Sequence, residues 1–477
     1  MSANGQYITF ESTASNLVSG DTNGMAADVF IHNRQTGQIG LISVTSSGTS
    51  GNDFSYAPSI STDGRYVTFA SDASNLVSGD TNGMEDVFIR DRQTNQTSLV
   101  SIASNNTQGT GNSFAPAISS DGCCIAFESY ASNLVSGDTN GVEDIFVRDW
   151  QTGQTSLISI TSNGTSGNAP SYTPSISADG RYVVFASDAS DLVNNDTNGA
   201  VADVFVRDRQ TGQTSLVSVA SNSTQGNDFS SFPSISADGC CVAFVSQGTN
   251  LVSSDTNNSA DVFIRNLKTN QTRRVSISSG GVQGNGTSNF PSISTDGRYI
   301  SFSSTASNLV SGDTNGNIDI FVHDLQTGKT TRVSVTSNGT QVNGNTVLTS
   351  TSISANGHYV AFVSSSSSLV SGDTNGKNDV FIHNYLSGST TVYLPFILKP
   401  APTNLFIQNL TLGIVSSYKV HNTPQGDIIC SNITPGLKVF CGSFTPGIYM
   451  VSVSTVCGAD SKLITFSSGV VTRTVSC

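Results

Sequence analysis

The sequence predicts an all-β protein, a seven-bladed β-propeller followed by a small C-terminal domain similar to a β-sandwich. The first observation behind this prediction is a repeat of 58 to 60 residues. In each copy an Asp-Gly or Asn-Gly pair recurs, with its glycine at Gly5, Gly64, Gly122, Gly180, Gly239, Gly297 and Gly357. Regular spacing of this length marks a repeat architecture. The second observation is that apolar residues alternate with period two, whereas no stretch of about ten residues has a helical period.

The second copy of the repeat shows the four strands expected in each blade. These are Ser59–Ser61, Tyr66–Phe69, Asp86–Arg90 and Leu99–Ile102. Asp63-Gly64 is a turn between the first two strands, and Gln93–Gln96 is a turn between the last two. Four short antiparallel strands in each of seven units predict seven blades around a central channel.

The first blade is expected to be incomplete within this chain. Met1–Gly5 aligns with Ile60–Gly64, so the sequence begins inside the first strand of that blade. An upstream segment, the chain's own Asn404–Leu410, or a strand from a neighbouring subunit could fill the place. Strand donation by a neighbour would be head-to-tail and would yield an extracellular filament.

The repeat resembles that of TolB-like propellers. The run Pro58–Phe69 matches the TolB-like pattern, in which a Pro-x-x-Ser-x-Asp-Gly turn precedes a strand ending in Phe. The continuation through Asn75–Val77, Asp80–Gly83 and Asp86–Phe88 is similar to a variant found in secreted bacterial proteins. The resemblance covers residues 1 to about 395. It implies the fold, whereas many tasks use the same scaffold.

The composition indicates an exported protein that binds neither nucleic acid nor the membrane interior. Only 12% of the residues are charged and the net charge is −13. Nucleic acid is bound through Lys and Arg clusters, which are absent from this sequence. No apolar run reaches the roughly 18 residues that a membrane span requires. We therefore expect a secreted or cell-surface location, with other protein subunits as partners.

Three domains or segments are predicted. Residues 1–396 form the propeller, 397–402 a proline-rich linker, and 403–477 a small β domain with expected strands at Asn404–Leu410 and Tyr449–Ser454. Small domains often need disulfides, and this one holds four candidate cysteines: Cys430, Cys441, Cys457 and Cys477. They form two disulfides in any of three pairings, or remain buried thiols.

The other cysteines form two adjacent pairs, Cys123-Cys124 and Cys240-Cys241, which replace the Arg-Tyr pair of other blades. One member of each pair is expected to fill a core position as a small apolar residue. The alternative is a vicinal disulfide or a bridge between blades.

The Asp-Thr-Asn-Gly-x-x-Asp loop is the candidate site for chemistry, and calcium is the candidate cofactor. It brings two carboxylates and an amide together within seven or eight residues, which is how calcium loops gather hard oxygen ligands. The candidate ligands are Asp21, Asn23, Asp28, Asp80, Asn82, Asp86, Asp138, Asn140, Asp144, Asp196, Asn198, Asp203, Asp255, Asn257, Asp261, Asp313, Asn315, Asp319, Asp373, Asn375 and Asp379. In the alternative interpretation these residues form Asx turns and cap the third strand. Blades one and four carry an extra residue in the loop and blade five has Asn258 in place of Gly, so weaker binding is expected there.

The sevenfold repetition of the carboxylates favours a structural or binding role over catalysis. Few residues break the symmetry. Glu11 and Glu128 follow the second-strand Phe in two blades, and His32, His323 and His383 replace Arg90 in three. We expect the glutamates on the surface or facing the channel, and the histidines exposed. The alternatives to a non-enzymatic structural or adhesive protein are a carbohydrate-active enzyme using the channel mouth and a periplasmic TolB-like interaction protein.

Overall fold

The computed structural model describes residues 1–342, 351–370, 373 and 375–385, together with the backbone of six strands between 403 and 466. The chain divides into two compact units, 1–398 and 399–477. All regular elements in the described residues are β-strands. No helix in this part of the chain is long and apolar enough to cross a membrane.

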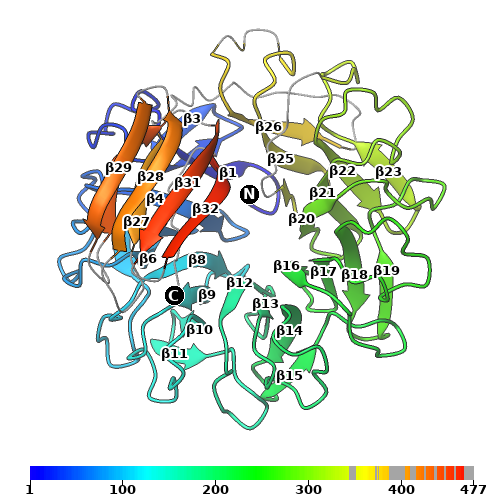
Figure 1. Cartoon of the computed structure of the whole chain (residues 1–477), viewed down its shortest axis with the longest axis horizontal. Coiled ribbons are helices and arrows are strands. Elements are labelled where there is room, and N and C mark those ends of the chain that lie inside the picture. The colour runs from blue at the N-terminus through cyan, green and yellow to red at the C-terminus, as the bar shows by residue number, and fades with distance from the viewer. Residues whose placement is uncertain are drawn as a thin grey trace. The chain divides into compact units, whose positions relative to one another are not determined.

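The first unit confirms the predicted seven-bladed propeller (Figure 1). Its sheets follow one another along the chain, and each blade begins near the central axis and ends at the rim. In chain order the blades are β1–β3 (Tyr7–Ser12, Asp28–Asn33, Gln38–Leu41); β4–β7 (Ser55–Ile60, Tyr66–Ser71, Asp86–Asp91, Gln96–Leu99); β8–β11 (Ser113–Ile118, Cys124–Ser129, Asp144–Asp149, Gln154–Leu157); β12–β15 (Ser171–Ile176, Tyr182–Ser187, Asp203–Asp208, Gln213–Leu216); β16–β19 (Ser230–Ile235, Cys241–Ser246, Asp261–Asn266, Gln271–Arg274); β20–β23 (Ser288–Ile293, Tyr299–Ser304, Asp319–Asp324, Lys329–Arg332); and β24–β26 (Ser352–Ile353, Tyr359–Ser364, Asp379–Asn384).

The innermost strand of each complete blade carries a bulge just before its proline. In blade two Tyr56 pairs with Ala70 and Ser59 pairs with Thr68, so Ala57 and Pro58 fall outside the ladder. Proline has no N–H to donate to a ladder, and Ala57 takes a φ of 49°. The same left-handed conformation recurs at Ala115, Thr173, Phe232 and Phe290.

The outermost strand differs from its prediction. In blade two it is Gln96–Leu99 rather than Leu99–Ile102, and the turn before it is residues 92–95. The chain leaves the ladder after Leu99 because Ser101 directs its hydroxyl to Asp86 and Ile102 pairs with Gln108 in a link to the next blade. The prediction was wrong there because alternation continues past the end of the hydrogen-bonded strand.

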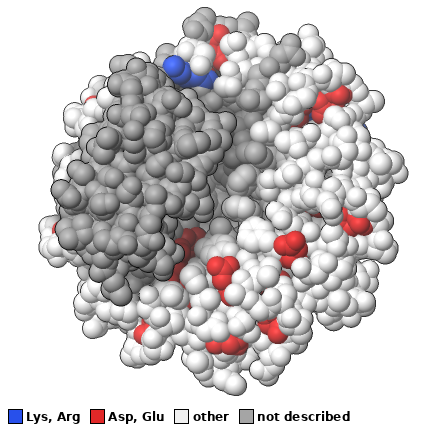
Figure 2. Space-filling model, viewed as in Figure 1, with Lys and Arg blue, Asp and Glu red and all other residues white. Residues whose placement is uncertain are grey.

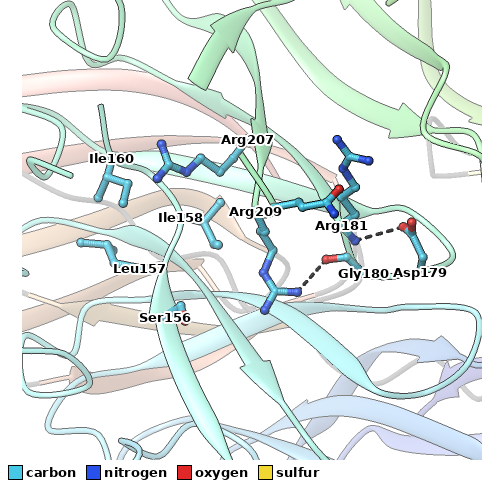
Figure 3. A pocket seen from close by; sticks show the side chains of 10 residues that line it. Ser156, Leu157, Ile158, Ile160, Asp179, Gly180, Arg181, Arg207 and Arg209 are labelled. Atoms are coloured by element: carbon cyan, nitrogen blue, oxygen red, sulfur yellow. Dashed lines mark hydrogen bonds between the residues drawn. The ribbon is translucent and has the colours of Figure 1, made fainter. Parts of the chain in front are cut away.

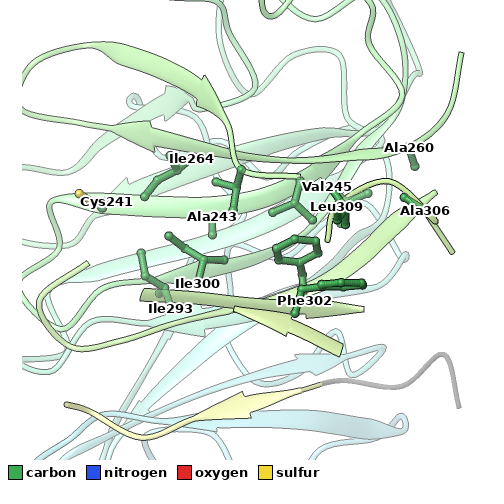
Figure 4. Close-up of a cluster of buried hydrophobic side chains, with 13 residues drawn as sticks. Cys241, Ala243, Val245, Ala260, Ile264, Ile293, Ile300, Phe302, Ala306 and Leu309 are labelled. Carbon is green, nitrogen blue, oxygen red and sulfur yellow. The ribbon is translucent and has the colours of Figure 1, made fainter. Parts of the chain in front are cut away.

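The apolar core lies between consecutive blades (Figure 4). Ala243, Val245 and Ile264 of blade five pack against Ile300 and Phe302 of blade six. Each blade also stacks the phenylalanines of its two middle strands, as in Phe69–Phe88 with ring centroids 5.8 Å apart. Such burial is the main stabilising contribution in a fold whose blades contact only their neighbours.

Tyrosine and glycine form a second contact between blades. The Tyr7 ring of blade one lies against Gly64 of blade two, where an added Cβ would come within 2.4 Å of the ring. The ring closes with the same contact, between Tyr359 of blade seven and Gly5. The closure also has a backbone hydrogen bond of 3.1 Å from Ala355 N to Ala3 O, and the equivalent bonds between other blades are 3.0–3.2 Å long.

The second unit contains two antiparallel sheets. One pairs β27 (Thr403–Gln408) with β30 (Lys438–Phe444). The other has the order β29-β28-β31-β32, formed by Gly426–Ile433, Val415–Thr423, Gly447–Thr455 and Gly458–Phe466. The side chains of the four candidate disulfide cysteines lie outside the described residues: Cys430, Cys441, Cys457 and Cys477. The predicted linker, residues 397–402, also lies outside them.

Candidate functional site

The structure brings the three predicted polar residues of each loop together at the start of the blade's third strand. In blade two, Asp86 is completely buried at the first position of β6. Asn82 Nδ2 lies 3.1 Å from Asp86 Oδ2, and Asn82 Oδ1 accepts a hydrogen bond of 2.8 Å from Met84 N. The predicted Asx turn is therefore present at Asn82.

Asp86 does not cap the strand in the way that the alternative interpretation expected. The N–H of Val87 donates to Ser101 Oγ at 3.1 Å, and the Ser101 hydroxyl donates in turn to Asp86 Oδ1. A serine just beyond the outermost strand thus links the carboxylate to the ladder. The equivalent serines, which sequence analysis did not single out, are Ser43, Ser159, Ser218, Ser276 and Ser334.

A glutamine was also missed by the sequence analysis. Gln108, on the link to blade three, places Nε2 at 2.9 Å from Asp80 Oδ1 and 2.8 Å from Asp86 Oδ2. Aligning the repeats would have revealed it, because Gln225, Gln283 and Gln341 occupy the same offset from their aspartates.

Burial makes the charged form of the inner aspartates unfavourable. It raises the pKa of Asp28 to about 7, and the pKa values of Asp86 and Asp144 to about 6. Hydrogen bonds from the linking serines oppose this shift in part. Among the residues described here, no group of three or more His, Cys, Asp or Glu side chains could hold a metal. Calcium therefore stays a prediction, and it would require amide, hydroxyl and water ligands.

The two symmetry-breaking glutamates bind backbone amides of the next blade. Glu11 Oε2 accepts from Ala57 N at 3.1 Å, and Glu128 Oε1 accepts from Thr173 N at 2.6 Å. Both amides belong to the left-handed bulges of the innermost strands. Each glutamate therefore satisfies a donor that the bulge removes from the ladder.

Glu128 gives a testable pH dependence. It is 4% exposed, and burial together with the neighbouring Glu143 raises its pKa well above the ordinary value. A carboxyl whose pKa is raised by folding stabilises the folded state at low pH, and this contribution is lost as pH rises through the folded-state pKa. Glu128→Gln keeps an acceptor for Thr173 without the charge. We expect urea unfolding at pH 5 and pH 8 to show a smaller difference in stability for this variant than for the parent.

The control for this prediction is Asp53→Asn, which removes an exposed carboxylate whose only described role is to accept a hydrogen bond from Phe54 N. This variant should keep the parental pH dependence. An equal change in both variants would contradict the role of Glu128.

The three histidines are buried, and the expectation that they are exposed was wrong. His32, His323 and His383 are 1%, 3% and 5% exposed. They occupy the position of Arg90, which is itself buried because its guanidinium donates to Thr45 O of the preceding blade and to Thr97 Oγ1. His323 Nδ1 likewise lies 2.8 Å from Thr330 Oγ1. Polar side chains at this position bind the adjoining strand and not solvent.

The cysteine pairs place their sulfurs side by side. Cys123 and Cys124 have Sγ atoms 3.0 Å apart, and Cys240 and Cys241 have theirs 2.8 Å apart. Cys124 and Cys241 are buried in the cores between blades, where they replace tyrosine against the next blade's glycine. The predicted core role of one member of each pair agrees with this packing.

The short separation leads to a prediction of vicinal disulfides under oxidising conditions. We expect the intact mass of protein produced without reductant to be lower, by two hydrogens for each bridge, than that of the reduced protein. Peptide mapping should assign the bridges to Cys123-Cys124 and Cys240-Cys241. Alkylation of all four thiols in non-reduced, unfolded protein would contradict the prediction.

A cavity of about 650 Å³ lies beside the contact of blades three and four (Figure 3). Three arginines line it, and each is held by the protein. Arg181 pairs with Asp208 at 2.7 Å, Arg207 donates to Thr161 O, and Arg209 donates to Gly180 O. The arginines of this cavity therefore serve to join strands. The face of the molecule in Figure 2 has scattered Asp and Glu side chains and few Lys or Arg side chains.

Comparison with known proteins found similar solved structures, all at low sequence identity. No family model matches the chain, and no curated protein sequence matches it. Solved structures similar to it include TolB from Acinetobacter baumannii, 16% identical with a TM-score of 0.39 over 80% of this chain and 78% of that one. Oligogalacturonate lyase from Vibrio parahaemolyticus is 14% identical, with a TM-score of 0.49 over 82% and 89%. Acylaminoacyl peptidase from Pyrococcus horikoshii is 9% identical, with a TM-score of 0.48 over 94% and 56%.

Proposed function

We propose that this protein is an exported, non-enzymatic propeller that acts through contacts with other proteins, as a structural or adhesive component that assembles with copies of itself. The observation that carries the proposal is that the residues that break the sevenfold symmetry make structural contacts within and between blades. Glu11 and Glu128 bind bulge amides, and the histidines fill buried positions between strands. An active site in a propeller would instead gather different residues of several blades around one open pocket.

Self-assembly would place a sheet edge of one copy against a different surface of the next copy. Unpaired strand edges are sites at which another chain can add a strand. Because donor and acceptor would differ, the contact would be head-to-tail. Only 12% of the residues in the whole sequence are charged, and this low fraction supports an extracellular location.

Two measurements on the full chain test the proposal. Sedimentation velocity and negative-stain electron microscopy should show concentration-dependent polymers, and a monomer at every concentration would overturn self-assembly. Incubation with neutral and acidic polysaccharides should release no products. Turnover that is lost in Glu128→Gln would establish the carbohydrate-active alternative and overturn the non-enzymatic role.

A further inference from the structure

One residue divides the polar loops of the first six blades into two classes. It lies 22 residues after the inner aspartate, on the link to the next blade. In blades two, four, five and six it is a glutamine: Gln108, Gln225, Gln283 or Gln341. In blades one and three it is a serine: Ser50 or Ser166. The six loops therefore provide a comparison within a single molecule.

In the glutamine class, an amide nitrogen lies where the oxygens of the loop converge. Gln283 Nε2 is 2.8 Å from Asp255 Oδ1 and 2.9 Å from Asp261 Oδ2. Gln225 Nε2 is 2.9, 2.7 and 2.9 Å from oxygens of Asp196, Asp203 and Asn198. The amide thus supplies N–H donors to carboxylates that water cannot reach freely.

Blades five and six add a positive charge of their own. Arg274 lies 3.8 and 3.6 Å from the carboxylates of Asp255 and Asp261, with its side chain 5% exposed. Arg332 occupies the same place in blade six, 3.4 Å from Asp313 and from Asp319. Blades one to four have leucine at this position of the outermost strand: Leu41, Leu99, Leu157 and Leu216.

In blade one, four buried oxygens accept no hydrogen bond of normal length and angle. They are Asp21 Oδ1, Asn23 Oδ1, Asp28 Oδ2 and Ser50 Oγ. Asp28 is 0% exposed and Ser50 4%. The two carboxylate atoms correspond to those that bind Gln108 in blade two. Buried acceptors without partners are costly, so their convergence points to a ligand that carries positive charge.

Blade three repeats this arrangement with fewer open oxygens. Asp138 Oδ1 and Asp144 Oδ2 are buried and accept no hydrogen bond of normal length and angle, and Asp144 is 0% exposed. The side chains of Asn140 and Ser166 lie near Asp144 and stabilise its charged form weakly. Asn140 differs from Asn23 because its Oδ1 already accepts from Val142 N at 3.1 Å, while its Nδ2 donates to Ser166 Oγ at 2.9 Å. Blade three thus keeps the two carboxylates and loses the amide oxygen as a ligand.

We propose that the serine-class loops of blades one and three bind calcium, and that glutamine replaces the ion in blades two, four, five and six. The ligands in blade one are oxygens of Asp21, Asn23, Asp28 and Ser50, with water completing the shell. Calcium accepts carboxylate, amide and hydroxyl oxygens together in a flexible shell of 6–8 ligands. Exposed residues of the loop, such as Thr22 and Gly24, leave room for the water ligands.

The two sites should differ in affinity, with blade one binding more tightly. This order reverses the expectation from loop length, which placed blade one among the weaker sites. The extra residue in its loop leaves Asn23 Oδ1 without the N–H donor that the shorter loops provide to their asparagines.

The test begins with the full chain after a chelator has removed bound ions. Calcium is then added, and its binding is measured by isothermal titration calorimetry and by equilibrium dialysis. We expect two sites per chain. Ser50→Gln should remove the tighter site, Ser166→Gln the weaker one, and the double variant both. These variants copy the glutamine of the other blades, so they should fold, and their melting temperature in chelator should not fall below that of the parent. Magnesium in place of calcium should give at least tenfold weaker binding.

A gain of binding provides the complementary test. Gln108→Ser removes the amide of blade two and should raise the number of calcium ions bound from two to three. The matched control is Gln283→Ser in blade five, where Arg274 remains and no site should appear. Absence of binding in the parent, sites in all the loops, or unchanged stoichiometry in Ser50→Gln would each overturn the proposal.

Discussion

Phe263→Ala is expected to lower the free energy of unfolding of the propeller by about 3–5 kcal/mol, as measured for phenylalanine truncations in other cores. Phe263 is 0% exposed in the core between blades four and five and stacks on Phe244 with ring centroids 5.9 Å apart. Removal of the Phe263 ring leaves a cavity at the contact between two rigid sheets, and these sheets cannot collapse around it. The cost should therefore lie toward the upper end of this range.

The measurement is urea unfolding followed by the fluorescence of Trp150, the single tryptophan of the chain, which packs against the core between blades two and three. The midpoint should fall while the slope stays unchanged. Val282→Ala is the control, because Val282 is 60% exposed and substitutions at such sites usually change stability by less than about 0.5 kcal/mol. A similar shift in both variants would show that the blade contact is not what stabilises the propeller.

The repeat made the fold predictable, because each element is seen several times in the sequence. The turns at Asp63-Gly64 and its counterparts, the middle strands and the number of blades follow from spacing and alternation alone. The end of the outermost strand was mispredicted because alternation does not reveal that Ser101 leaves the ladder to bind Asp86.

The candidate site was predictable in part. The loop spacing places Asp80, Asn82 and Asp86 together, since all three lie in one short loop. Gln108 comes from the next link and Arg274 from another strand, and only tertiary contacts bring such residues to the loop. The histidines were misjudged for the same reason, because a polar residue in an alternating strand gives no sign that it faces an adjoining blade.

Gly239→Ala is expected to be the second most damaging of these changes, because it breaks the tyrosine–glycine contact between blades four and five. Gly239 has a φ of 67°, and an added Cβ would lie 2.3 Å from Tyr182 Cδ2. The ring cannot move away freely, since the Arg181 guanidinium lies 4.7 Å from its centroid on the same blade. A left-handed alanine costs about 1–2 kcal/mol, and overpacking of this kind adds about 1–3 kcal/mol.

The control for this change is already present in the chain. Gly297 also has a positive φ, of 71°. The residue that faces Gly297, as Tyr182 faces Gly239, is Cys241, and its side chain lies 3.4 Å from the added Cβ. Gly297→Ala should therefore cost only the backbone contribution of about 1–2 kcal/mol. In the double variant Tyr182→Cys with Gly239→Ala, the contact with the ring is removed, so unfolding measured by Trp150 fluorescence should show a smaller cost for Gly239→Ala than in the parent. Additive costs in this cycle would mean that the ring and the glycine do not interact. A coupling of about 1–3 kcal/mol would instead identify the contact that also joins Tyr359 to Gly5 where the ring of blades closes.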